Sequence, residues 1–203
     1  MMTEIIVFLA KYLVWVLLAF TIVVIGLDLW KGTSSRQHII TRIKHANWRK
    51  VGYIVLAFLL SFLVAQLLHL LPVEYYRPYQ IIMTAPLITP NADTPFPSDH
   101  VMFVFALAFS IIFMTRYKKI GLIGLAMAIG VAIGRVSALV HSPLDVFGGI
   151  LCAVIGAAVW YYLYYRETPK NLPKDLKKLW KKTKELTILI TSYIAGLIRR
   201  IKR

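Results

Sequence analysis

The sequence predicts an all-α membrane protein, a polytopic bundle of about five transmembrane helices followed by a C-terminal interfacial amphipathic helix. Of its 203 residues, 59% are hydrophobic, a fraction that argues against a soluble domain. Several apolar runs are close to the ~20 residues that a membrane-spanning helix requires. Because these runs do not alternate, helices are the form that satisfies their backbone polar groups inside a membrane.

Five apolar runs are expected to span the membrane. The first begins almost at Met1, but it lacks the basic segment and the cleavage site of a signal peptide and is too long for one, so we expect a retained helix. We expect Lys11, Ser61 and Gln66, inside these runs, to reach the interface or to bond to neighbouring helices rather than to line a lipid groove. The predicted spans are residues 5–27, 51–71, 101–115, 120–140 and 144–165.

Small residues within the runs predict close packing between helices. Glycines recur in the last two runs, where they would let helix backbones approach each other. The single cysteine, Cys152, also lies in an apolar run, so neither a disulfide nor a cysteine metal site is expected. The glycines concerned are Gly124, Gly130, Gly134, Gly148 and Gly149.

The basic residues predict the orientation of the chain. Of 24 Lys and Arg, six lie in residues 31–50, three in residues 116–119 and twelve in residues 166–203, so that 21 fall on one side of the predicted membrane. The positive-inside rule places these segments in the cytoplasm, with the amino terminus outside and the carboxyl terminus inside. The net charge of +15 is therefore an orientation signal, and no nucleic-acid partner is predicted.

A basic tail follows the membrane domain. We assign residues 1–165 to the membrane domain and residues 166–203 to a cytoplasmic tail. In the tail, apolar residues recur at helical spacing among lysines, and the apolar stretch of residues 186–198 is too short to span a membrane. The pattern favours an amphipathic helix held on anionic membrane lipids, with a solvated, partly disordered basic tail as the alternative.

Three polar clusters lie at the ends of the predicted spans, all on the outer face. Charges at this depth are costly and usually functional. The loop of residues 72–99 carries two of the clusters, and its six prolines exclude one continuous helix, so we expect an ordered lid. The clusters are Tyr76-Arg77-Pro78, Pro97-Ser98-Asp99-His100, and the segment from Arg135 through His141 to Asp145.

The second cluster precedes the third span. Ser98 or Asp99 is expected to cap that helix, whose free N–H groups would then face outward. Because a helix N-terminus binds phosphate readily, Ser98 is a candidate phosphate contact, and His100 could give a proton to a leaving group. An ordinary capped helix with an interfacial histidine explains this cluster equally well when it is taken alone.

The third cluster contains residues that capping explains and one that it does not. Pro143 suits the first position of a helix, and Ser142 with Asp145 resembles a capping box. Asp145 could also hydrogen-bond one ring nitrogen of His141 and leave the other nitrogen nucleophilic. Arg135 requires an anionic partner at the end of an apolar helix, and its guanidinium suits phosphate. Arg77 raises the same question.

Taken together, the clusters resemble the motifs of the type 2 phosphatidic acid phosphatase superfamily of membrane lipid phosphatases. The resemblance covers residues 50–165 and rests on Arg77-Pro78, on Pro-Ser-x-His at residues 97–100, and on Arg135-x5-His141-x3-Asp145. The Pro-Ser-Asp-His form, together with the preceding residues 91–96, is further similar to bacterial undecaprenyl-diphosphate phosphatases of the bacitracin-resistance type.

The chain departs from this family pattern at several positions. The first motif usually begins with a Lys seven residues before its Arg, and Leu70 stands there. We expect the adjacent His69 to bond between helices rather than to replace that Lys. Asp99 and Gly134 occupy positions that are usually Gly and Ser, and we expect Asp99 to act as an anion at the helix N-terminus. The family core commonly has six spanning helices, and five are predicted here.

The resemblance implies a mechanism and a substrate. His141 would attack the terminal phosphorus, Asp145 would orient it, and His100 would protonate the leaving group and later activate water. Arg77, Ser98 and Arg135 would hold the phosphate oxygens, and neither a metal nor another cofactor is implied. The implied substrate is a membrane lipid phosphate, first undecaprenyl diphosphate, whose hydrolysis recycles the lipid carrier of peptidoglycan synthesis. Phosphatidylglycerol phosphate and phosphatidate are the alternatives.

Two other function classes fit the sequence less well. A non-catalytic lipid-binding protein would leave the six polar site residues unexplained. A transporter predicts polar residues near the middle of the membrane, whereas here they lie at helix ends.

Overall fold

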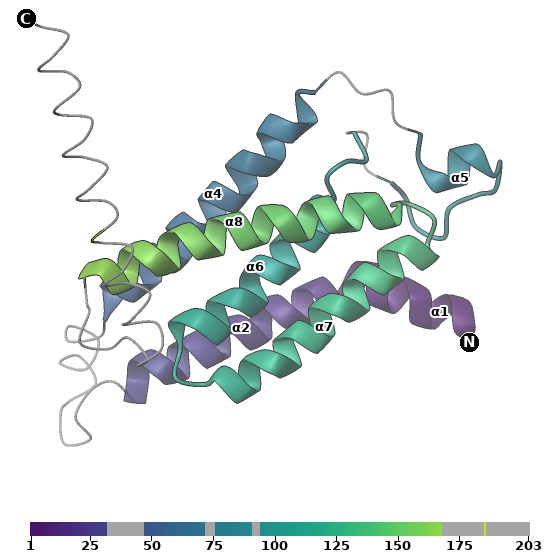
Figure 1. The fold of residues 1–203 in the computed structure, drawn as a ribbon. Coiled ribbons are helices and arrows are strands. Elements are labelled where there is room, and N and C mark those ends of the chain that lie inside the picture. The colour runs from purple at the N-terminus through teal and green to yellow at the C-terminus, as the bar shows by residue number, and fades with distance from the viewer. Residues whose placement is uncertain (32–46, 72–75, 91–93, 168–184, 186–203) are drawn as a thin grey trace, which may run out of the picture. The chain divides into compact units, whose positions relative to one another are not determined.

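A computed structural model of the chain describes residues 1–31, 47–71, 76–90, 94–167 and 185. Every regular element within these residues is helical, which confirms the all-α prediction for this part of the chain (Figure 1). The elements are α1 (Met2–Val7), the π-helical turn η1 (Phe8–Tyr12), α2 (Leu13–Lys31), α4 (Trp48–His69), α5 (Pro78–Ile81), α6 (Asp99–Met114), α7 (Lys118–Ser137) and α8 (Pro143–Glu167).

The chain forms two compact units, Met1–Tyr161 and Tyr162–Arg203. All three polar clusters belong to the first unit. The amphipathic helix predicted for the tail lies outside the described residues.

Within the described residues, four helices are long and apolar enough to cross a membrane. They are Met2–Lys31, which joins α1, η1 and α2, then Trp48–His69, Lys118–Ser137 and Pro143–Arg166. The fifth apolar helix, α6, has 16 residues, a length of roughly 24 Å against a hydrocarbon layer of ~30 Å. Each of the five predicted runs therefore corresponds to one apolar helix.

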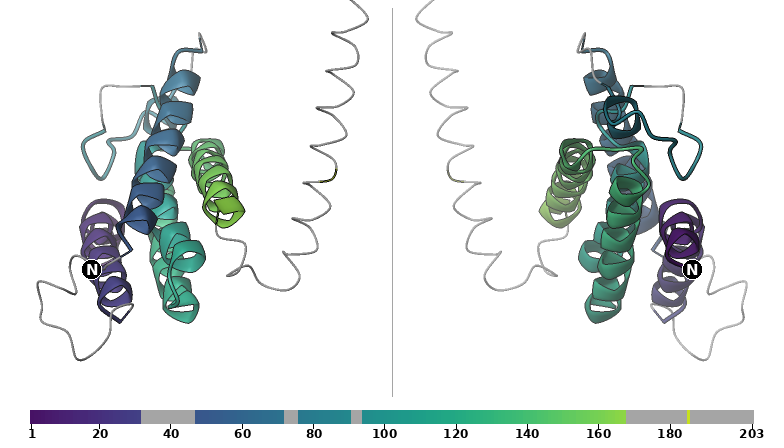
Figure 2. Two further views of the ribbon diagram at one scale, coloured as in Figure 1. Left: turned by 90° about the vertical axis from the view of Figure 1, so that its left-hand side faces the viewer. Right: turned by 90° about the vertical axis from the view of Figure 1, so that its right-hand side faces the viewer.

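The helix α6 forms the centre of the unit. It packs against α2, α4 and α7 (Figure 2). Its buried residues, among them Val101, Val104 and Ala108, join Leu17 of α2 and Val131 of α7 in the main apolar core. Large apolar side chains elsewhere remain exposed, as expected where helices face lipid.

Glycines bring several helices into backbone contact. A Cβ on Gly134 of α7 would lie 2.7 Å from the backbone nitrogen of Ala10 in η1, and one on Gly149 of α8 would lie 2.6 Å from the carbonyl oxygen of Ser98. At Gly124 the same atom would make only ordinary contacts, the nearest at 3.5 Å. The predicted role in close packing is thus confirmed at Gly134 and Gly149.

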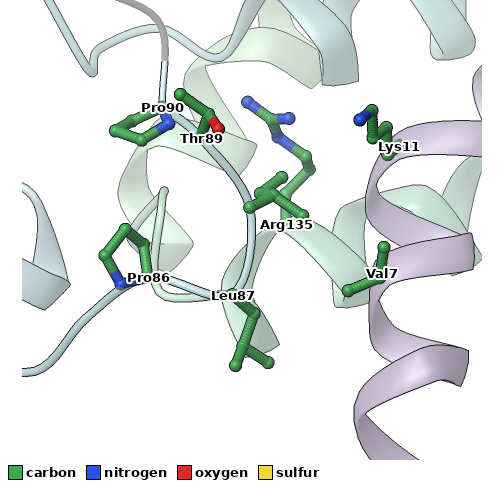
Figure 3. A pocket seen from close by; sticks show the side chains of 8 residues that line it. Val7, Lys11, Pro86, Leu87, Thr89, Pro90 and Arg135 are labelled. Carbon is green, nitrogen blue, oxygen red and sulfur yellow. The ribbon is translucent and has the colours of Figure 1, made fainter.

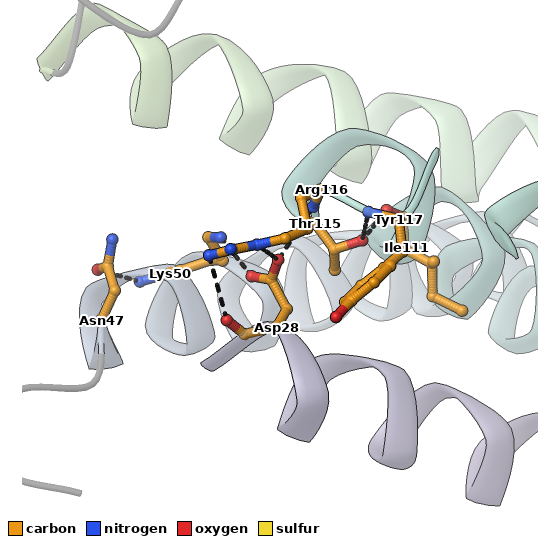
Figure 4. A network of polar contacts seen from close by, with 7 residues as sticks. All are labelled: Asp28, Asn47, Lys50, Ile111, Thr115, Arg116 and Tyr117. Atoms are coloured by element: carbon orange, nitrogen blue, oxygen red, sulfur yellow. Dashed lines mark hydrogen bonds and ion pairs between the residues drawn. The ribbon is translucent and has the colours of Figure 1, made fainter. Parts of the chain in front are cut away.

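A buried ionic cluster joins the helices at the end that carries the basic connections. Asp28 of α2 is 2% exposed and accepts a hydrogen bond of 2.6 Å from Lys50 Nζ of α4. Two further bonds of 3.0 Å come from the backbone nitrogen and Nε of Arg116, which follows α6 (Figure 4). One carboxylate therefore ties α2, α4 and the α6–α7 connection together.

Candidate active site

The turn between α7 and α8 carries the third cluster. Leu139 has a left-handed backbone, with φ of 64°, a conformation that is uncommon outside glycine and often found at functional sites. The N–H of Ser142 donates to Asp145 Oδ2 over 2.6 Å, and the N–H of Asp145 donates to Ser142 Oγ over 3.2 Å. These reciprocal bonds confirm the predicted capping box and start α8 at Pro143.

The hydrogen bonds of His141 define its tautomer. Its ring is 4% exposed, with Nδ1 at 3.1 Å from the Pro95 carbonyl oxygen and Nε2 at 3.1 Å from Arg135 Nη2. A carbonyl can only accept and a guanidinium can only donate. The proton therefore lies on Nδ1, and Nε2 presents its lone pair.

Asp145 lies beside the same ring, farther from Nδ1 than the Pro95 carbonyl is. Its Oδ2 is 3.6 Å from Nδ1 of His141, longer than a hydrogen bond. The orienting role of Asp145 stays a prediction, and the carbonyl of Pro95 also holds the ring nitrogen, at closer range. Asp145 stands next to the ring as a fully buried carboxyl.

Burial lowers the pKa of His141 below its usual value of 6.5. The nearby Arg135 and Arg77 charges lower this pKa further, whereas the Asp145 carboxylate acts in the opposite direction. The imidazole is therefore neutral near pH 7. A neutral ring with an Nε2 lone pair is the form that can act as a nucleophile.

The first cluster is docked on the α7–α8 turn. Arg77 is 5% exposed, and its Nη1 donates over 2.9 Å to the carbonyl of Val140, the residue before His141. The backbone N–H of Tyr79, in the short helix α5, donates over 3.1 Å to the carbonyl of Leu139. The described part of this loop is thus held on the turn, and Arg77 lies next to the imidazole.

The second cluster meets the start of α8. Ser98 occupies the N-cap position of α6 and is fully buried, but its side chain makes no capping bond. Its N–H donates over 3.0 Å to the carbonyl of Asp145. Its Oγ has no hydrogen-bond partner among the described residues, and a buried hydroxyl in that state is suited to a ligand oxygen.

The helix α6 places His100 close to this junction. His100 is partly buried in the first turn, two residues after Ser98. His69, the last residue of α4, reaches the same helix end, with Nε2 at 3.1 Å from the Pro97 carbonyl oxygen and 3.9 Å from Asp99 Oδ1. His69 therefore joins the end of α4 to the segment that leads into α6.

Arg77, Ser98, Arg135, His141 and Asp145 are thus all buried, and hydrogen bonds link the segments that carry them, through the Val140 and Asp145 carbonyls and between Arg135 and His141. Leu70, at the position where the resemblance expects a Lys, is 77% exposed. The turn expected at residues 91–93 lies outside the described residues. Among the described residues, no three His, Cys, Asp or Glu side chains form a group that could hold a metal ion.

A cavity of about 510 Å³ opens beside this cluster, a size that suits a small ligand group. Arg135 forms one side, residues 86–90 form another, and Val7 and Lys11 of the first helix close a third (Figure 3). The N–H of Leu87 donates over 3.3 Å to the carbonyl of Ala138, which fixes this loop on the α7–α8 turn.

Sequence reasoning missed three participants in the site. The carbonyl groups of Pro95 and Val140 bind His141 and Arg77, and a backbone acceptor has no side-chain signature to detect. Lys11 was expected to reach the interface, whereas it borders the cavity. The sequence did contain a sign of this position, because a lone cation in an apolar span is usually functional.

Comparison with known protein families accounts for the three clusters. The family model described as the PAP2 superfamily matches residues 50–169, which is more than half of the chain and includes all three motifs. The chain belongs to the PAP2 superfamily. It is therefore a membrane phosphatase of this family, and membership implies a lipid phosphate as substrate.

Several curated PAP2 relatives are similar over most of the chain. The bacitracin transport permease protein BcrC of Bacillus licheniformis is 33% identical over 77% of this chain and 69% of its own length. The undecaprenyl-diphosphatase BcrC of Bacillus subtilis is 28% identical over 75% of this chain and 69% of its own. The putative undecaprenyl-diphosphatase YbjG of Escherichia coli is 33% identical, with coverages of 76% and 70%. No solved structure matches the chain.

Proposed function

We propose that this PAP2 phosphatase hydrolyses undecaprenyl diphosphate to undecaprenyl phosphate and inorganic phosphate through a phosphohistidine intermediate. The observation that carries the chemistry is the buried imidazole of His141, whose Nε2 lone pair faces the Arg135 guanidinium. The choice of lipid draws on the motif form at residues 97–100 and on two relatives named as undecaprenyl-diphosphatase or putative undecaprenyl-diphosphatase. Such an activity would return the lipid carrier to peptidoglycan synthesis and support resistance to bacitracin.

In the first step, Nε2 of His141 attacks the terminal phosphorus. A nitrogen–phosphorus bond forms while the bond from this phosphorus to the bridging oxygen breaks. Undecaprenyl phosphate leaves with that oxygen, and His100 gives the departing group a proton. Arg77, Arg135 and Ser98 hold the oxygens of the transferring group, because positioning and charge stabilisation supply most of the catalysis in phosphoryl transfer.

In the second step, water releases the phosphate from the enzyme. His100, now neutral, takes a proton from a water molecule that attacks the phosphorus. The nitrogen–phosphorus bond breaks, its electron pair returns to Nε2, and inorganic phosphate departs. Nδ1 of His141 keeps its proton throughout, donating it to the Pro95 carbonyl, so His141 returns to the tautomer with which it began.

The proposed arrangement in the membrane places this site on the extracytoplasmic face. The five apolar helices span the bilayer within the membrane domain of residues 1–165, and the basic tail of residues 166–203 binds anionic lipids on the cytoplasmic side. In support, Lys50 and Arg116 meet at the helix ends opposite the site through their shared partner Asp28. The positive-inside rule assigns that end to the cytoplasm.

Phosphate release by the purified full chain tests the function. Undecaprenyl diphosphate and phosphatidylglycerol phosphate are supplied in parallel, with a chelator present. We expect release from the diphosphate by the wild type and none by His141→Ala. Equal release by the two proteins would eliminate the proposed nucleophile, and preference for phosphatidylglycerol phosphate would reassign the substrate. A wild type that acts on neither lipid would favour a lipid-binding protein without catalysis.

The intermediate can be trapped in a second experiment. His100→Ala lacks the base for the second step, so phosphate from a terminally labelled diphosphate should accumulate on the protein. The label is expected to be acid-labile and alkali-stable, as a phosphoramidate is, and to be absent from the double variant with His141→Ala. A label that persists in the double variant would place the covalent step on another residue.

A further inference from the structure

Lys11 sits within the first apolar helix, yet it borders the same cavity as Arg135. Figure 3 shows the ammonium group of Lys11 and the guanidinium of Arg135 at the same end of the cavity, projecting from facing helices. We propose that Lys11 is a phosphate-binding residue that selects diphosphate substrates by holding the phosphoryl group next to the lipid. This assignment rests on the proposed function for the identity of the substrate.

The packing of the first helix fixes the position of Lys11 relative to Arg135. Lys11 lies in the π-helical turn η1, a type of distortion that often marks functional sites. Gly134, the neighbour of Arg135, lets the backbone of Leu9 and Ala10 approach α7, since any Cβ at Gly134 would lie 2.7 Å from Ala10. A side chain at residue 11 is therefore held level with residue 135.

The charge of the cavity favours an anion. Among the described residues that line it, two are cations, Lys11 and Arg135, and none is acidic. The Lys11 ammonium lies over the ring of Tyr12, 5.5 Å from nitrogen to centroid, which is a weak contact at an exposed site. Two like charges beside one cavity repel each other, and a bound phosphoryl group removes that repulsion.

The geometry separates the two phosphoryl groups of a diphosphate. The terminal group belongs at Nε2 of His141, which contacts Arg135 directly. The second group is one bridging oxygen away, and the cavity on the Lys11 side of Arg135 offers it space. Cleavage leaves negative charge on this second group, so Lys11 stabilises the leaving group. A lipid phosphomonoester has no phosphoryl group at that position, and Lys11 contributes little to its hydrolysis.

Kinetics on paired substrates test the selectivity. For Lys11→Gln, kcat/KM on undecaprenyl diphosphate should fall about tenfold to a hundredfold, as for one charge-assisted hydrogen bond. On phosphatidate, kcat/KM should change by no more than about threefold. The ratio of kcat/KM on undecaprenyl diphosphate to kcat/KM on phosphatidate therefore falls. Lys11→Arg should restore most of the diphosphate activity. Lys119→Gln, which changes an exposed lysine at the other end of α7, should match the wild type.

Binding provides a readout that does not need turnover. Affinity of the full chain for methylenediphosphonate should fall about tenfold in Lys11→Gln, because a charged contact is lost, while affinity for inorganic phosphate stays unchanged. Unchanged diphosphonate affinity, or equal losses for both anions, would overturn the role of Lys11 whether or not the protein hydrolyses lipids. Selective loss of diphosphonate binding in a protein that hydrolyses no lipid would support Lys11 and refute the enzymatic proposal.

Discussion

At the residue scale, the neutral state of His141 sets the acid limit of activity. Burial holds the pKa of His141 below 6.5. The imidazole therefore becomes protonated, and loses its lone pair, only at a pH below 6.5. We expect kcat/KM to fall as the pH drops below about 6.5, because the nucleophile becomes protonated. A pH–rate profile of the purified protein measures this decline, which forms the acid limb of the profile.

Two substitutions should move that limb in opposite directions. Arg135 lowers the pKa of His141 and Asp145 raises it. The acid limb of Arg135→Gln should therefore shift to higher pH, and that of Asp145→Asn to lower pH, alongside their losses of rate. Because any titration of the substrate is common to all three proteins, the relative order is the decisive quantity. Shifts of the same sign would show that these charges do not act on His141.

The hydroxyl of Ser98 should matter to activity more than to stability. It is buried and has no hydrogen-bond partner among the described residues, so Ser98→Ala removes a polar group that the fold does not use. We expect unfolding free energy to change by less than about 1 kcal/mol, and phosphate release to fall about tenfold to a hundredfold through a lost contact with a charged group. Thermal unfolding and initial rates measure the two effects.

Ser110→Ala is the matched control for this substitution. Ser110 is also buried in α6, but its Oγ donates over 2.8 Å to the Ala106 carbonyl within the same helix. Its replacement should leave the rate unchanged. A rate loss as large as that of Ser98→Ala would mean that any buried serine in this helix affects activity, and Ser98 would lose its specific role.

Local sequence patterns predicted which side chains come together at the site. They did not predict the contacts that these side chains make with distant parts of the chain. Arg135 lies in the last turn of one helix, Asp145 lies in the first turn of the next, and His141 lies in the short connection between them. Their proximity could therefore be predicted from their spacing. The Pro95 carbonyl is 46 residues from His141 along the chain, and only the tertiary fold brings the two together. The cavity position of Lys11 depends likewise on how the first helix packs against α7.

At the element scale, hydrophobic runs predicted the helices while local bonds decided their ends. The capping box at Ser142 and Asp145 could be predicted from sequence because both partners lie within one turn. The same reasoning failed for the side chain of Ser98, which occupies the N-cap position without capping. The short helix α5 and the π-helical turn η1 were not predicted, because neither changes the hydrophobic pattern around it.

Close packing between α6 and α8 should be necessary for the active geometry. A Cβ at Gly149 would lie 2.6 Å from the carbonyl oxygen of Ser98 and 3.0 Å from the backbone nitrogen of Met102. Backbone atoms cannot move aside cheaply, so Gly149→Ala should destabilise the protein by about 1–3 kcal/mol. By shifting Ser98 against Asp145, it should also lower kcat about tenfold to a hundredfold. Thermal unfolding and rates of the purified variant test both effects.

Gly26→Ala separates this contact from the general effect of replacing a helical glycine. No atom lies within 4 Å of a Cβ at Gly26 in α2, so the added methyl group should stabilise the helix by about 0.5–1 kcal/mol and leave the rate unchanged. If Gly149→Ala behaved like Gly26→Ala, the α6–α8 contact would not be needed for activity.

At the scale of the whole membrane unit, the two ends of the helices have different tasks. The site end gathers buried polar groups, and one of them, the hydroxyl of Ser98, has no hydrogen-bond partner among the described residues. The opposite end contains Asp28, which bonds to both Lys50 and Arg116. This division follows from physical requirements, since a site must leave polar groups available for substrate, and helices joined by long connections must be fixed elsewhere.

Loss of the Asp28 carboxylate should therefore reduce stability without altering the chemistry. In Asp28→Asn, Lys50 and Arg116 lose their shared anion. Breaking a buried pair is strongly destabilising, but Arg116 is half exposed, so we expect a cost of about 2–4 kcal/mol. Glu4→Gln, at an exposed pair with the amino terminus, should cost less than about 1 kcal/mol. Thermal unfolding in detergent compares the two variants with the wild type.

Below the unfolding transition, the specific activity of Asp28→Asn should equal that of the wild type, because the ionic cluster and His141 lie at opposite ends of the helices. A folded Asp28→Asn protein with reduced kcat would show that the two ends are coupled, and that the ionic cluster helps to set the geometry around the imidazole.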